Sequence, residues 1–83
     1  MISSAQMRAA RALLGIDQKT LAEMAGVSVP TIQRMESSQG NVRGVVGTLT
    51  KIIEALDAAG LELIGNEQPS QGRGRGVRLK EPQ

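Results

Sequence analysis

The sequence contains no cysteine, histidine, tryptophan, tyrosine or phenylalanine. Without cysteine the chain forms no disulfide and offers no thiolate, and without histidine it lacks the commonest metal ligand and the usual general base. Without aromatic rings it has no platform on which the bases of single-stranded nucleic acid or RNA could stack. We therefore expect no metal and no cofactor.

Catalytic patterns are missing as well. The carboxylates are scattered along the chain, and the glycines match no phosphate-binding loop. No apolar run is long enough to span a membrane, and the N-terminus has no signal-peptide core. We therefore expect a soluble cytoplasmic protein that is not an enzyme. Its 83 residues allow one small domain with a modest core, which a partner subunit would help to stabilise.

The net charge is also low. The formal net charge is only +2, whereas a DNA-binding domain usually carries a more pronounced basic surface. Clustering of the cations on one face would compensate. The weak charge keeps two classes open, a protein that binds DNA and a protein that binds only another protein.

Residues 18–36, QKTLAEMAGVSVPTIQRME, are the most informative part of the chain. They predict two short helices, with Gly26 at a turn that needs positive φ and Ser28 as the cap of the second helix. The apolar positions that would pack the two helices together are Leu21, Ala22, Ala25, Ile32 and Met35. This is the pattern of a helix-turn-helix, whose second helix can enter a DNA major groove. The motif can also serve only to bind protein.

Flanking signals predict the other elements. Ser3 and Gln6 form a capping box for a first helix that ends at Gly15. A fourth helix is expected from about Thr48 to Ala59. Residues 61–64 and 76–80 alternate as two strands of a β-hairpin, joined by a Gly- and Arg-rich loop. We expect a helix-turn-helix domain at 1–60 and a hairpin extension at 61–83 that contributes to dimerisation.

The sequence allows two interpretations for each of two further features. The apolar residues Val45, Val46 and Ile64 exceed the obvious needs of a four-helix core, and they fit either a plain core or a dimer interface. The run from Arg73 to Gly76 fits either a solubilising loop or an arm that contacts phosphate or a minor groove.

The chain resembles the phage-repressor-like helix-turn-helix regulators of the xenobiotic-response-element (XRE) type. The resemblance rests on "RALLGIDQKTLAEMAGVS", "TIQRME" and "TLTKIIEAL". The ending "AAGLELIG…GVRLK" is similar to a bacterial subgroup in which a hairpin replaces the fifth helix. This resemblance implies a mainly α fold, four helices with a C-terminal β-hairpin. It also implies a homodimeric transcriptional regulator, such as a repressor, that reads a palindromic operator in double-stranded DNA.

The resemblance also implies roles for particular residues. The family's base-contact positions fall on Val29, Pro30, Gln33 and Arg34. Its phosphate-contact positions fall on Gln18, Ser28, Thr31 and Arg43. Its structural ion pair falls on Arg11 and Glu36. The chain departs from the family pattern in the apolar pair at 29 and 30, where polar base readers are frequent, and in a longer loop after residue 36.

The main hypothesis is a sequence-specific DNA-binding regulator that acts as a homodimer, without a separate ligand-sensing domain. One alternative is an antiactivator, a protein-binding helix-turn-helix that sequesters a transcription factor. The weak charge and the apolar start of the third helix favour that alternative. A third possibility is an antitoxin-type autorepressor, which would also have a protein partner.

Overall fold

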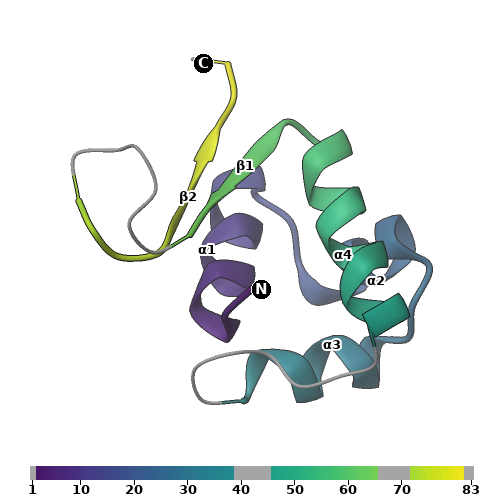
Figure 1. Ribbon diagram of the computed structural model, residues 1–83. Helices are drawn as coiled ribbons and strands as arrows, with labels where there is room; N and C mark the ends of the chain where they lie inside the picture. Colours follow the sequence, from purple (N-terminus) through teal and green to yellow (C-terminus); the bar gives the residue numbers. More distant parts are fainter. Residues whose placement is uncertain (1, 39–45, 66–71, 82–83) are drawn as a thin grey trace.

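The structure is a computed structural model that describes residues 2–38, 46–65 and 72–81. Four helices precede a two-stranded antiparallel hairpin (Figure 1). In chain order the elements are α1 (Ser4–Leu14), α2 (Gln18–Ala25), α3 (Val29–Glu36), α4 (Val46–Ala58), β1 (Leu61–Ile64) and β2 (Gly76–Leu79). The expected fold class, a mainly helical domain with a C-terminal hairpin, is confirmed. Within these ranges no helix has the length and apolar character needed to cross a membrane.

The start of α1 is fixed by local chemistry. The Ser3 hydroxyl accepts a hydrogen bond from the backbone N–H of Gln6 at 3.1 Å, and the Gln6 side chain accepts one from the N–H of Ser3 at 2.9 Å. This reciprocal pair satisfies two N–H groups that a helix start otherwise leaves without partners. Ile2 and Met7, at the positions of a hydrophobic staple, are both fully buried. The predicted capping box is therefore confirmed.

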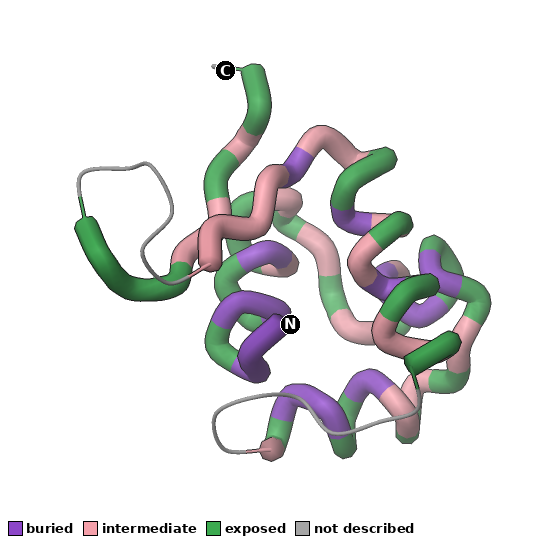
Figure 2. The backbone as a smooth tube through the Cα atoms, viewed as in Figure 1, coloured by how far each residue is buried: buried purple, intermediate pink, exposed green. Residues whose placement is uncertain are grey.

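The core lies where the inward faces of all four helices and β1 meet, and these faces appear purple in Figure 2. Each fully buried Leu, Ile or Met side chain contributes roughly 1.5–3 kcal/mol relative to an exposed one. The largest fully buried side chains are Ile2, Met7, Leu21, Ile32, Met35, Ile52, Leu56 and Leu61. The core thus joins the helix-turn-helix to both α1 and the C-terminal elements.

Helix α4 begins two residues earlier than the sequence predicted, at Val46 instead of Thr48. Gly47 therefore lies inside the helix, where glycine is less favourable than alanine. Burial of Ile52 and Leu56 further along the helix offsets this cost. Val46 itself is 78% exposed, so it is not a core residue. Val45 lies outside the described residues.

The hairpin packs on α1 through β2 and on α4 through β1. Its register pairs Leu61 with Leu79 and Leu63 with Val77 on the face toward the helices. The Gln6 side-chain amide, on α1, donates to the carbonyl oxygens of both strands near the loop end of the hairpin. Strand β2 ends at Leu79, one residue before the predicted end, although the N–H of Lys80 still donates to the Gly60 carbonyl at 2.8 Å.

Candidate nucleic-acid interface

Helices α2 and α3 form a helix-turn-helix. Gly26 follows α2 with φ of 71°, in the left-handed region that favours glycine, and its N–H bonds back to the carbonyls of Ala22 and Glu23. Ser28 then caps α3, because its hydroxyl accepts from the N–H of Thr31 at 3.3 Å. A turn of three residues therefore reverses the chain and sets the direction in which α3 leaves α2.

The outer face of α3 carries an exposed row of side chains, most of them polar. Pro30, Gln33 and Arg34 are exposed, and Ser37 follows just after the helix. These positions are spaced i, i+3, i+4 and i+7, so they share one face of the helix. Ile32 and Met35 are fully buried on the opposite side. Three of the four residues expected to contact bases are thus brought together on one solvent-facing surface.

Val29, the fourth residue expected to contact bases, is only half-buried and packs against the edge of the core. It offers a small apolar surface at the start of α3. Beside it, the hydroxyls of Ser28 and Thr31 lie 2.8 Å apart and are joined by a hydrogen bond. The structure therefore gathers two of the expected phosphate-contact residues at the N-terminus of α3.

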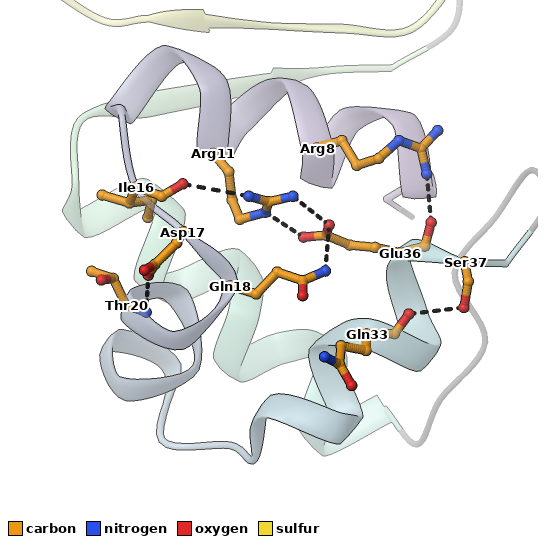
Figure 3. A network of polar contacts seen from close by, with 9 residues as sticks. All are labelled: Arg8, Arg11, Ile16, Asp17, Gln18, Thr20, Gln33, Glu36 and Ser37. Atoms are coloured by element: carbon orange, nitrogen blue, oxygen red, sulfur yellow. Dashed lines mark hydrogen bonds and ion pairs between the residues drawn. The ribbon is translucent and has the colours of Figure 1, made fainter.

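The other two expected phosphate-contact residues are placed differently. The Gln18 side-chain amide donates to Glu36 Oε1 at 3.1 Å, so part of its donor capacity is already used inside the protein (Figure 3). Arg43 lies outside the described residues. Lys19, next to Gln18 and exposed, is the cation nearest to this end of α2 in the sequence.

Glu36 is the point at which α1, α2 and α3 are tied together (Figure 3). Arg11 donates through Nε to Oε2 and through Nη2 to Oε1, each at 2.7 Å. Gln18 supplies the third bond to the carboxylate. The Glu36 side chain is only 4% exposed, against 21% for Arg11. The two residues expected to form an ion pair are therefore in bidentate contact, and the charge buried on Glu36 is fully compensated.

Arg8 belongs to the same cluster, although sequence reasoning did not single it out. Its Nη1 donates to the main-chain carbonyl of Glu36, at the C-terminal end of α3. A cation is favourable there because the last carbonyls of a helix carry partial negative charge. Arg8 and Arg11 are three residues apart on α1, and this spacing is the only sequence signal of their shared target.

Hydrogen bonds shift two pKa values in this region. The bond from Arg11 to Glu36 raises the pKa of the Arg11 guanidinium, which therefore stays charged throughout the accessible pH range. The bond from the backbone N–H of Thr20 lowers the pKa of Asp17 below its ordinary value of 3.8. Asp17 is thus an ionised cap for α2 at neutral pH. Across the described ranges, no group of three or more Asp or Glu side chains could hold a metal ion.

A helix-turn-helix family model matches residues 7–63, a span that runs from α1 into β1 and covers well over half of the chain. No curated protein matches the chain. The matched family is the XRE type of DNA-binding transcription regulators, related to phage repressors. The capped α2 and α3, the glycine turn and the exposed row on α3 are the structural counterpart of that match. The chain belongs to the phage-repressor-like helix-turn-helix family of DNA-binding transcription regulators.

Proposed function

We propose that this protein is a sequence-specific regulator that binds double-stranded DNA as a homodimer on a palindromic operator. The observation that carries the proposal is the exposed row on α3, in which Pro30, Gln33 and Arg34 share one face. A helix fits the major groove of B-DNA, where each base pair presents a distinct set of donors and acceptors. Side chains on this face are therefore the ones that would reach base edges.

Each side chain of the row has a chemical counterpart in the groove. The Arg34 guanidinium can donate two hydrogen bonds to O6 and N7 of guanine, and the Gln33 amide can bond to N6 and N7 of adenine. Pro30, with a smaller contribution from Val29, offers an apolar surface that suits the methyl group of thymine. The row can therefore discriminate between bases even though Pro30 is apolar.

Phosphate contacts would orient α3 in the groove. Ser28 and Thr31 lie at the N-terminus of α3, where helix N–H groups and the helix dipole favour an anion. Lys19 and Arg43 would add charge, and Gln18 can offer its remaining N–H while it stays bonded to Glu36. Because few cations are available, base contacts would carry a larger share of the binding affinity.

A homodimer would place two copies of α3 in successive major grooves, roughly 34 Å apart on one side of the duplex. Occupancy of a promoter by this dimer would block or assist the polymerase. Within each copy, the bonds of Arg11 and Gln18 to Glu36 hold α3 against α1 and α2. Regulation would come from protein concentration or from a protein partner.

Titration of labelled genomic fragments at several salt concentrations tests the proposal. Each neutralised phosphate adds roughly −0.9 to the slope of log K against log salt concentration. We expect specific complexes that survive competitor DNA and show a modest slope of about −3 to −5, given the few cations near the interface. Absence of any fragment that survives competitor would instead favour the antiactivator, in which the same row on α3 contacts a transcription factor.

A further inference from the structure

Strand β2 lies at an edge of the hairpin. In Figure 1, β1 lies on the side of α4 and β2 crosses beside α1, in agreement with the helix contacts of each strand. The sheet in the described part of the chain has only the order β1–β2. The side of β2 that faces away from β1 therefore carries no neighbouring strand there, and a two-stranded hairpin is marginal by itself.

The hydrogen-bond pattern shows which groups of β2 point toward this edge. The N–H of Lys80 donates to the carbonyl of Gly60 on the β1 side at 2.8 Å. Because successive residues of an antiparallel strand alternate in direction, Arg78 also bonds toward β1, whereas Val77 and Leu79 direct their N–H and C=O groups away from it. Within the described residues, no hydrogen bond reaches the outward main-chain groups of Val77 and Leu79.

A contact of Gln6 supports the same alternation. Gln6 Nε2 lies 3.1 Å from the carbonyl oxygen of Ile64 and 2.9 Å from that of Gly76, which are partners in the register. One nitrogen can reach both oxygens only if the two carbonyls point into the space between the strands. Gly76 therefore bonds toward β1, and Val77, the next residue, faces outward.

A groove runs along this open edge, between β2 and α1. From α1 it is lined by Ala5 and Ala9, both exposed, and from the C-terminal part of the chain by Arg75, Gly76 and Val77. No residue of β1 lines it. An added strand would find main-chain hydrogen-bond partners along β2.

We propose that this edge takes β2 of a second copy of the chain, paired antiparallel with Val77 on the two-fold axis. The proposal rests on the homodimer of the proposed function and specifies its contact surface. In a symmetric antiparallel pair, the apolar side chains of both strands lie on one face only if a residue is paired with its own copy across the two-fold axis. In the middle of β2 that residue is either Val77 or Arg78. Centring on Arg78 would set two like charges directly opposite each other, which destabilises a sheet.

Centring on Val77 avoids that repulsion. It sets Arg78 opposite the partner subunit's Gly76, where no side chain competes for space. Arg78 keeps its bond to Glu62 on the solvent face, at 3.0 Å. The joined hairpins would form a four-stranded sheet in the order β1–β2–β2–β1, which removes the open edge of each copy.

The absence of cysteine makes cross-linking a clean test. Two copies of Val77→Cys would meet with Cα atoms about 5.5 Å apart, within the range of a disulfide. Leu63→Cys is the matched control, since Leu63 pairs with Val77 on the same face of the hairpin. Its two copies would lie three strand spacings, about 14 Å, apart. We expect mild oxidation to convert most of the Val77→Cys protein, and almost none of the Leu63→Cys protein, into a covalent dimer.

Sedimentation of the unmodified chain completes this test. Suppose that the unmodified chain sediments as a dimer. If the Val77→Cys variant then stays uncross-linked, or the Leu63→Cys variant cross-links equally well, the proposed edge is overturned and the homodimer is left intact. A chain that sediments only as a monomer would overturn both the edge and the homodimer. The DNA titration reports separately on the row of α3, so failure of the edge and failure of DNA binding remain distinguishable.

A proline variant provides a second test that needs no oxidation. Val77→Pro removes an N–H that makes no bond within the hairpin, so the fold should survive, as the far-ultraviolet circular dichroism would show. We expect a folded monomer. Arg78→Pro is the control, because it removes an N–H that faces β1 and should disrupt the hairpin itself. A Val77→Pro protein that remains a dimer would contradict the proposal.

Discussion

Arg11 of α1 donates two hydrogen bonds of 2.7 Å to the two carboxylate oxygens of Glu36, the last residue of α3. Gln18 of α2 contacts the same carboxylate, and Arg8 contacts the main-chain carbonyl of Glu36. One acidic residue therefore fixes α3 to both preceding helices. Because α3 is the helix proposed to enter the groove, this cluster couples the stability of the fold to the geometry of recognition.

Arg11→Ala and Glu36→Ala should each lower the free energy of unfolding. A buried ion pair that loses one partner typically costs about 3–5 kcal/mol, and we expect a loss at the lower end of this range. The loss is at the lower end because the Arg11 side chain is 21% exposed. The double variant should lose less than the sum of the single losses, with a coupling of about 0.5–3 kcal/mol in a urea-denaturation cycle. Strictly additive losses would mean that the pair does not stabilise the fold as a unit.

Arg34→Ala should weaken binding to the selected operator by about 1–3 kcal/mol without lowering the melting temperature, because Arg34 is exposed and lies off the core stripe of α3. Lys51→Ala is the control, since it removes one exposed positive charge from α4. Operator titration should separate the two variants. Equal affinity of Arg34→Ala and wild type would reject the base-contact role, and a large fall in its melting temperature would show that Arg34 is structural.

Asp17→Asn should change the pH dependence of stability at acid pH. The folded-state pKa of Asp17 lies below its ordinary value of 3.8, because the carboxylate accepts the bond from Thr20. The stabilisation from ionised Asp17 is therefore complete above the unfolded pKa and is lost as pH falls through the folded pKa. Melting temperatures of wild type and Asp17→Asn should differ most near neutral pH and converge as the pH falls below the folded-state pKa. A constant difference between pH 2 and 7 would contradict this origin.

Gln6→Glu separates the two roles of Gln6. The carboxylate can still accept the N–H of Ser3, so the cap of α1 survives, but it cannot donate to the carbonyls of Ile64 and Gly76. Gln6 is only 4% exposed, so the loss should be about 1–3 kcal/mol or more. Hydrogen exchange should show earlier opening of the hairpin than of α1. Wild-type stability for Gln6→Glu would mean that the bridge to the hairpin is unimportant.

Local signals were enough to predict most of the fold. The Ser3 box, the Ser28 cap and the turn at Gly26 act over a few residues, and the structure confirms each of them. The start of α4 was wrong by two residues, because a glycine-rich run reads as a loop when the burial of the helix beyond it is not considered. Local chemistry is therefore readable from sequence, whereas an element boundary that depends on packing is not.

Contacts between distant residues were mostly beyond prediction. Gln6 bonds to carbonyls 58 and 70 residues away, and Arg8 bonds to a main-chain oxygen 28 residues away. Every residue has the same main-chain carbonyl group, so the sequence does not show which carbonyl a side chain will contact in the fold. The hydrogen bond from the Gln18 amide to Glu36 could not be predicted either, because it depends on how α2 and α3 pack together.

Selection of binding sites from a pool of random duplexes tests the central claim most directly. The claim is that two copies of α3 read DNA through the row that contains Gln33 and Arg34. We predict enrichment of an inverted repeat with half-site centres about 10 base pairs apart. We also predict that Arg34→Ala relaxes the preference at one position in each half-site. A pool that stays random after repeated rounds with the full chain would contradict the account.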